Sequence, residues 1–269
     1  MSISKKALKK ALAVFGYELH RSSRKDVSFS NFVDLAQAYE QRLNESGVFI
    51  PANETRLSLL ARLLGTPPPE AYFIVHALAK CEDINGDVCE FGVAQGETSA
   101  LIANEIRAGT KTLHLFDSFE GLPKPTEEDQ LKDDILSLGS MEAYTGTMSY
   151  PEERVRTRLG TVRFPPQRVV IHKGFVENVL THDSNLPEEV NFAYVDLDLY
   201  EPIKLALDFL HRATSIGSVI IVDDYDHFST GVKKAVDEFL EDKNKSVTTY
   251  ECLVPNKQYG CFAVLTRRG

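Results

Sequence analysis

Carboxylate side chains follow two short apolar segments in the second half of the chain. Residues 191–195 end at Asp196, and residues 218–222 end at Asp223 and Asp224. Both segments are short, apolar and rich in β-branched or aromatic residues, which predicts buried strands. Residues 202–213 between them have the apolar content of a helix packed on a sheet. Such a crossover brings both strand ends to one edge of a parallel sheet, where open α/β sheets bind ligands.

Three carboxylates at one edge repel one another unless a cation joins them. Oxygen-only ligands suit a hard divalent ion, so Asp196, Asp223 and Asp224 are candidate ligands for Mg²⁺. A single aspartate after a strand is often only a helix cap or a solvent-facing side chain. Two clusters at the same end of neighbouring strands favour the cation site.

A glycine-containing turn is predicted at residues 90–98, between a strand over 87–92 and a helix over 98–107. Gly92 and Gly96 permit a tight turn and close approach of a ligand to the backbone. The free N–H groups at the start of the following helix suit a carboxylate. Ala94 replaces the middle glycine of the dinucleotide-binding motif. The glycine pair alone is also consistent with a purely structural turn.

A further strand is predicted over residues 112–117 and ends at Asp117. An acidic residue at this place can accept both ribose hydroxyls of an adenosine, as in dinucleotide folds; helix capping is the competing role. His114, His172 and His182 are assigned no role.

The composition bounds the class of protein. The 269 residues are 43% hydrophobic, enough for one large α/β domain, and the net charge of −9 argues against a nucleic-acid partner. No apolar run approaches the roughly 20 residues that cross a bilayer, and the first 20 residues lack the features of a secretory signal. The four cysteines show no metal-binding spacing. We therefore expect a soluble, cytoplasmic protein with free thiols.

The elements that position these residues can be outlined. Residues 1–80 are predicted to be helical and part of the same domain, with Leu8, Leu12 and Phe15 on one stripe of an amphipathic helix over 4–17. We expect a homodimer with this region at or near the interface.

Residues 81–269 carry the sheet, and runs at 247–254 and 260–267 predict a hairpin whose last strand is antiparallel. Residues 124–167 are charged and unusually long for a connection, which predicts a mobile lid, helical near 152–159; the alternative is a solvated surface excursion.

Four motifs in order carry a family resemblance: EFGVAQGETS, FDSFEGLP, YVDLDLYEP and VDDYDHFSTGVKKAVDEF. Together they resemble the macrocin O-methyltransferase family, S-adenosylmethionine- and Mg²⁺-dependent enzymes that methylate sugar hydroxyls of macrolide and aminocoumarin antibiotics. The resemblance covers roughly residues 87–267. It implies a class I methyltransferase fold, a Rossmann-like sheet of seven strands, mostly parallel, with an antiparallel strand from the C-terminal hairpin.

The resemblance also implies roles for individual residues. The metal ligands would be Asp196, Asp223 and Asp224. The cofactor would be held by the glycine turn, by the start of the following helix and by residues at the strand ends. These residues are Glu90, Gly92, Gly96, Thr98, Asp117, Ser118 and Gly174. Family members often carry Asp-Gly-Asp followed by Met-Tyr, where this chain has Asp-Leu-Asp-Leu-Tyr at 196–200.

The predicted reaction is methylation of a sugar hydroxyl on a small-molecule glycoside. Asp196 is the first candidate for taking the proton and His227 the second. A phenol or catechol acceptor is the main alternative, since metal-dependent methyltransferases of the same fold also use them. A metal-dependent glycosyltransferase is a weaker alternative, because that function would not explain the glycine turn.

Overall fold

The structure is a computed structural model that describes residues 41, 53–245, 247 and 249–269. The chain divides into two compact units, Met1–Arg42 and Leu43–Gly269, and all elements below belong to the second unit. The predicted helix over 4–17, and with it the expected dimer contact, lies outside the described residues.

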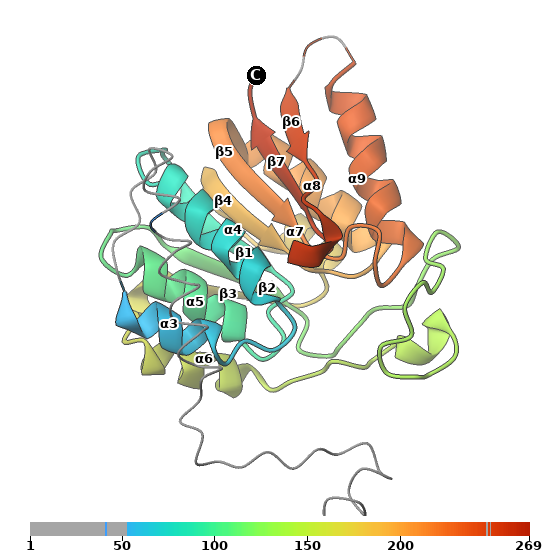
Figure 1. Ribbon diagram of the computed structural model, residues 1–269, viewed down its shortest axis with the longest axis horizontal. Helices are drawn as coiled ribbons and strands as arrows, with labels where there is room; N and C mark the ends of the chain where they lie inside the picture. Colours follow the sequence, from blue (N-terminus) through green and yellow to red (C-terminus); the bar gives the residue numbers. More distant parts are fainter. Residues whose placement is uncertain (1–40, 42–52, 246, 248) are drawn as a thin grey trace, which may run out of the picture. The chain divides into compact units, whose positions relative to one another are not determined.

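A seven-stranded sheet forms the centre of this unit (Figure 1). Its strands follow the order β3-β2-β1-β4-β5-β7-β6. The first five are parallel, whereas β7 is antiparallel to both β5 and β6. This arrangement confirms the predicted sheet and its antiparallel C-terminal hairpin. The strand bounds are Asp87–Phe91 (β1), Leu113–Asp117 (β2), Val169–Lys173 (β3), Val190–Val195 (β4), Thr214–Val222 (β5), Tyr250–Leu253 (β6) and Ala263–Arg267 (β7).

Helices cover both faces of the sheet because successive strand residues point to opposite sides. One core joins Val88, Leu115 and Tyr194 of the strands to helices α4, α5 and α6. The other joins alternate residues, such as Phe91 and Val195, to helices α7, α8 and α9. The helix bounds are Glu54–Leu60 (α3), Pro68–Lys80 (α4), Glu97–Ile106 (α5), Glu152–Thr161 (α6), Val176–His182 (α7), Tyr200–Ala213 (α8) and Thr230–Lys243 (α9). In the described part of the chain, no helix is long and apolar enough to cross a membrane.

Helices α3 and α4 begin where the sequence contains start signals. The Asn53 side chain accepts a hydrogen bond from the Arg56 N–H at 3.0 Å, which caps α3. Pro68 begins α4, where a missing N–H is harmless. The loop between the two helices, which includes Thr66, reaches the same edge of the sheet as the candidate site residues.

The predicted lid consists of two structurally different parts. Its helix, α6, is the crossover between β2 and β3 and packs beside α5, and Val155 and Leu159 are buried in the core. The preceding part, drawn in green in Figure 1, extends away from the sheet and contains only the short 3-10 helix Met141–Tyr144. Movement of this part stays a prediction.

The segment before α6 is attached to the domain at both of its sides. Lys132 N donates to the Phe228 carbonyl at 2.9 Å, and Gly146 N donates to the Leu122 carbonyl at 2.9 Å. The side chain of Tyr144 is buried against the ring of Phe228. The stretch between these anchors, around residues 133–140, is the more exposed part of the segment.

Candidate active site

A single cavity of about 560 Å³ lies where the parallel strands end, within the roughly 300–1,000 Å³ range of ligand pockets. It brings together residues that follow all five parallel strands. All but one of the sequence-predicted site residues line it: Glu90, Gly92, Thr98, Asp117, Ser118, Gly174, Asp196, Asp223, Asp224 and His227. The exception is Gly96.

The two glycines of the turn after β1 have different functions. Gly92 has a φ of +79°, and a Cβ there would lie 1.7 Å from the Asp196 carbonyl oxygen. Only glycine therefore lets the end of β1 approach the end of β4 so closely. A Cβ on Gly96, which has a φ of +80°, would lie 3.1 Å from the Cα of Val155. Gly96 thus makes room for α6 and does not reach the cavity wall.

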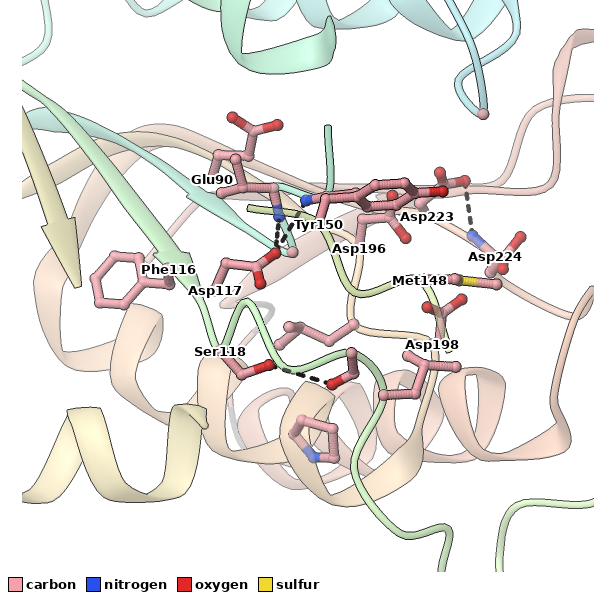
Figure 2. A pocket seen from close by; sticks show the side chains of 18 of the residues that line it. Glu90, Phe116, Asp117, Ser118, Met148, Tyr150, Asp196, Asp198, Asp223 and Asp224 are labelled. Carbon is pink, nitrogen blue, oxygen red and sulfur yellow. Dashed lines mark hydrogen bonds between the residues drawn. The ribbon is translucent and has the colours of Figure 1, made fainter. Parts of the chain in front are cut away.

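Asp117 connects the loop after β2 to the glycine turn (Figure 2). Its Oδ2 accepts hydrogen bonds from Val93 N at 2.7 Å and Ala94 N at 2.9 Å, and its Oδ1 accepts one from Phe119 N at 2.6 Å. A carboxylate has about four acceptor sites. Asp117 therefore holds the turn in place and keeps acceptor capacity for about one further ligand hydroxyl.

Ser118 closes its own loop. Its hydroxyl donates to the Gly121 carbonyl at 3.2 Å and accepts from Glu120 N at 3.0 Å. Gly174, after β3, donates its N–H to the Asp117 carbonyl at 3.0 Å. These bonds fix the shape of this wall of the cavity.

Glu90 is a buried acid on the cavity wall, with the Ser99 hydroxyl nearby. Neither carboxyl oxygen of Glu90 makes a close hydrogen bond within the described residues. Burial, together with the nearby charge of Asp117, raises the pKa of Glu90 to about 8, although the Ser99 hydroxyl beside it acts in the opposite direction. A ligand that brings a cation or hydrogen-bonding groups would satisfy this side chain.

Four aspartates form an acid cluster at the ends of β4 and β5: Asp196, Asp198, Asp223 and Asp224. Figure 2 shows them in one part of the cavity, while Glu90, Asp117 and Ser118 lie in another part. Asp198 and Asp224 have positive φ values of 63° and 54°, a conformation that aspartate tolerates better than most residues.

The pKa values of this cluster reflect crowding. Burial raises the pKa of Asp196 well above its usual value, and the charge of Asp223 adds to the effect. The pKa of Asp198 is likewise raised by burial and then by Asp224. Burial, followed by the charge of Asp224, raises the pKa of Asp223 to about 6. Full ionisation of the cluster is therefore unfavourable unless a cation or hydrogen-bond donors compensate it.

Two residues behind the cluster were not predicted from the sequence. The Tyr194 hydroxyl lies 2.6 Å from Asp223 Oδ2 and 3.1 Å from Glu70 Oε1. Burial, and then the charge of Asp223, raises the pKa of Glu70 well above its usual value. The one hydroxyl hydrogen cannot fully satisfy both acids, so a proton held by Glu70 completes the arrangement.

His227 is held between two carboxylates. Its Nδ1 lies 3.1 Å from Asp224 Oδ1, and its Nε2 lies 3.2 Å from Asp133 Oδ2 in the segment before α6. Both ring nitrogens therefore lie beside carboxylates in this arrangement.

The oxygen atoms of the acid cluster are of the kind that a hard divalent cation prefers. In their present positions, however, the side chains do not surround a common point where such a cation could bind. The carboxyl group of Asp196 has no hydrogen-bond donor among the described residues, and the cluster offers only oxygen ligands. In the described residues, no group of three or more His, Cys, Asp or Glu side chains is arranged to hold a metal ion.

The mouth of the cavity adds residues from two further segments. Thr66, before α4, lies 2.8 Å from the Thr98 hydroxyl. Met148 and Tyr150, within the predicted lid segment 124–167, line the cavity, whereas Tyr144 and Phe164 of the same segment are buried in the domain. Three exposed apolar side chains, which carried no sequence signal for a site, also line it: Leu64, Ile135 and Leu136.

Comparison with known proteins finds relatives among curated proteins and among solved structures. A curated protein of Streptomyces olivaceus, 8-demethyl-8-(2,3-dimethoxy-alpha-L-rhamnosyl)-tetracenomycin-C 4'-O-methyltransferase, is 27% identical over 147 residues, 54% of each chain. The match thus spans about half the length of this curated relative. The O-methyltransferase NovP superposes with a TM-score of 0.63 at 21% identity, over 90% of this chain and 100% of that chain.

Another relative is a solved structure of CalS11, described as a TDP-rhamnose 3'-O-methyltransferase of calicheamicin biosynthesis. It superposes with a TM-score of 0.52 at 21% identity, over 86% of this chain and 93% of that chain. At these identities the two structures establish the fold, which is that of the class I O-methyltransferases. The family model described as "Macrocin-O-methyltransferase (TylF)" matches residues 74–249. That match covers well over half of the chain and includes the acid cluster and the glycine turn, so the chain belongs to the macrocin O-methyltransferase family.

Proposed function

We propose that this protein transfers the methyl group of S-adenosylmethionine to a sugar hydroxyl of a glycosylated small molecule, with Mg²⁺ in the site. The observation that carries the proposal is the single cavity that joins the glycine turn and Asp117 to the acid cluster. Membership of the macrocin O-methyltransferase family and the sugar-methylating relative support it.

The cofactor side of the cavity suits S-adenosylmethionine. The cofactor carries no phosphate, and its sulfonium is positively charged, which matches an acid-lined cavity with no Lys or Arg among its described lining residues. Asp117 has capacity left for a ribose hydroxyl. Glu90, whose carboxyl oxygens are buried and make no close hydrogen bond within the described residues, can hydrogen-bond to the methionyl part.

The acid cluster is the proposed acceptor side. Asp196, Asp223 and Asp224 would hold Mg²⁺ after side-chain rotation, and the bound cation would lower the pKa of the acceptor hydroxyl and orient it. Asp196 is the better candidate for taking the proton, because both nitrogens of His227 already contact carboxylates. Tyr194 holds Asp223 from behind.

The test combines calorimetry with a methyl-transfer assay. Asp196→Asn and Asp223→Asn should each weaken Mg²⁺ binding and lower turnover by at least about 100-fold, since several kcal/mol of transition-state stabilisation are lost. Binding of S-adenosylmethionine should stay within about threefold. Asp226→Asn is the matched control for cation binding, because Asp226 lies in the same loop but pairs with Lys132 and Lys257 outside the cavity.

Two outcomes would contradict the proposal. Full turnover in excess chelator would remove Mg²⁺ from it. Turnover of a catechol, with none of any glycoside, would replace the sugar acceptor by a phenol.

A further inference from the structure

We infer that Asp129 is a positioning residue for the acid cluster: it fixes the backbone of the loops that carry the four aspartates, so that binding a cation requires only side-chain rotation. The inference rests on the proposed function and deepens it by naming what holds the proposed Mg²⁺ site in shape. Asp129 lies in the connection between β2 and α6, far from the cluster in sequence, and does not line the cavity.

The carboxylate of Asp129 is buried and fully used. The residue is 5% exposed. Its Oδ1 accepts a hydrogen bond from Tyr200 N at 2.7 Å, and its Oδ2 accepts bonds from the backbone N–H and the hydroxyl of Thr126, both at 2.8 Å. Tyr200 is the first residue of α8, and the residue before it, Leu199, provides no side-chain cap. Asp129 therefore caps α8 from a distant part of the chain, where a negative charge is favourable.

This cap fixes one end of the first aspartate loop. The loop carries Asp196 and Asp198 and runs from the end of β4 to Tyr200. The sheet holds its start, because Asp196 N donates to the Phe91 carbonyl at 2.8 Å, and Asp129 holds its end. A backbone that is fixed at both ends loses little conformational entropy when its side chains turn toward a cation.

The segment around Asp129 also holds the loop after β5, which carries the other two aspartates of the cluster. Leu131 forms a β-bridge with Ser229 at the end of that loop, and Thr230 N donates to the Gln130 carbonyl at 3.0 Å. The Ser229 hydroxyl in turn donates to the Asp198 carbonyl at 2.7 Å. The two aspartate loops are therefore joined to each other and to this segment.

Gly231, in the first turn of α9, makes room for this arrangement. A Cβ at this position would lie 1.9 Å from Asp129 Oδ1 and 2.8 Å from Tyr200 N. The starts of α8 and α9 thus meet Asp129 at a point that admits no side chain. Gly231→Ala should displace Asp129 from the N–H that it caps, and so breaks the same bond while Asp129 stays in the chain.

A cap of this kind could also stabilise the fold without any effect on the site. Asn244 provides the control for that reading, because its side chain joins the end of α9 to the start of β6 and does not line the cavity. It accepts from Thr249 N at 2.8 Å and Tyr250 N at 2.9 Å, and donates to the Tyr250 carbonyl at 2.9 Å. Asn244→Ala therefore removes a set of side-chain bonds of similar size far from the aspartate loops.

The experiment combines calorimetric titration with Mg²⁺ and hydrogen exchange. Asp129→Ala should raise the dissociation constant of Mg²⁺ by at least about 10-fold, because the loops must then become ordered on binding. Exchange at the Tyr200 amide should become at least about 10-fold faster, and added Mg²⁺ should slow it again. Gly231→Ala should change both quantities in the same direction. Asp129→Asn keeps an acceptor for Tyr200 N and should restore the Mg²⁺ dissociation constant to within about threefold of the wild-type value.

Two further measurements separate positioning from stability. Asn244→Ala should lower the melting temperature but leave the Mg²⁺ dissociation constant unchanged. Binding of S-adenosylmethionine should stay within about threefold in every variant, because the cofactor residues lie in another part of the cavity. Thr126→Ala removes one of the three bonds to Asp129 and decides the matter where Asp129→Ala does not fold: it should raise the Mg²⁺ dissociation constant by about threefold.

The outcomes distinguish this inference from the proposed function. A wild-type Mg²⁺ dissociation constant in Asp129→Ala or, where that variant does not fold, in Thr126→Ala would overturn the inference and leave the proposed function standing. So would an equal loss of Mg²⁺ affinity in Asn244→Ala. Asp129→Asn as weak as Asp129→Ala would show that the charge acts and the bond to Tyr200 N does not. Wild-type protein that binds no Mg²⁺ would overturn the proposed metal together with the inference.

Discussion

Individual carboxylates of this site could be predicted from the sequence, but their supporting residues could not. Asp196, Asp223 and Asp224 stand out because each follows a run of buried strand residues. Tyr194 looks like one more core residue of such a run, and Glu70 lies on a helix far away in sequence. Tyr194 meets Asp223 only once β4 and β5 pair, and Glu70 meets Tyr194 only once α4 packs on the sheet. No local pattern could show either contact.

Tyr194 provides the first residue-scale prediction. Tyr194→Phe removes the hydroxyl that lies between two buried acids, so we expect the free energy of unfolding to fall by about 1–3 kcal/mol. Urea denaturation measures this change. Tyr225→Phe is the control, because the Tyr225 hydroxyl bonds Asp237 and Lys233 near the surface; its change should stay within about 0.5 kcal/mol. Equal unfolding midpoints for both variants would contradict the role given to Tyr194.

Asp117 provides the second residue-scale prediction. Asp117→Ala should weaken binding of S-adenosylmethionine by about 1.5–3 kcal/mol, the range for hydrogen bonds to charged groups, because it removes a ribose acceptor and releases the glycine turn. Asp87→Ala is the control: Asp87 also bridges β1 and the start of β2, through Thr112 N at 2.8 Å, but does not line the cavity. Calorimetry should show an unchanged dissociation constant for this control. The same result for Asp117→Ala would refute its cofactor role.

At the scale of elements, the sequence indicated a long connection at residues 124–167 but not where its irregular part ends. Its charge and length predicted a lid over 124–167, and the helix near 152–159 was assigned to that lid. The structure instead packs α6 beside α5, with Val155 and Leu159 buried in the same core as residues of the sheet. The apolar spacing of these two residues was the available signal, but the surrounding charges of α6 obscured it.

The exposed stretch around residues 133–140 therefore carries the lid prediction. The Tyr144 hydroxyl donates to Asp134 Oδ1 at 2.7 Å and accepts from Leu136 N at 2.8 Å. Tyr144→Phe removes both bonds, so we expect hydrogen exchange at Leu136 to become about 5- to 10-fold faster and KM for the acceptor to rise. Binding of S-adenosylmethionine should not change. Tyr259→Phe, at an exposed tyrosine of the β6–β7 connection, is the control and should change neither the exchange rate nor KM. Unchanged hydrogen exchange in Tyr144→Phe would show that other contacts hold the stretch around residues 133–140.

At the scale of the whole molecule, the alternation of strands and helices predicted a mostly parallel sheet with an antiparallel C-terminal hairpin strand, but it did not predict the order of the strands within the sheet. The structure does not test the expected assembly, because Leu8, Leu12 and Phe15 lie outside the described residues. The expected homodimer therefore stays a prediction. Light scattering of the full chain and of a chain lacking residues 1–20 tests it: a dimer that becomes a monomer on truncation supports the predicted interface, and a monomer in both cases contradicts it.

Buried titratable groups make the stability of the whole domain depend on pH. Burial raises the pKa of Asp223 to about 6 and that of Glu90 to about 8, whereas carboxyl groups of unfolded chains titrate near 4. Protonation of these two groups therefore contributes its whole stabilisation of the folded state below about pH 4. The contribution of Asp223 is lost as the pH rises through about 6, and that of Glu90 as it rises through about 8. Burial lowers the pKa of His172 and His211, which costs stability as the pH falls below about 6.5. We expect the melting temperature without ligands to fall on both sides of a weakly acidic optimum.

Mg²⁺ should reverse the loss on the alkaline side, because a cation binds ionised carboxylates and stabilises the folded state in which they converge. We therefore expect the rise in melting temperature on adding Mg²⁺ to be larger at about pH 8.5 than at about pH 5.5, where Asp223 is largely protonated. Calorimetric melting with and without chelator measures this difference. The double variant Asp196→Asn/Asp223→Asn should abolish it and Asp226→Asn should retain it, since only the first removes ligands of the proposed site. A Mg²⁺ effect that is equal at both pH values, or that survives in the double variant, would place the cation elsewhere on the protein.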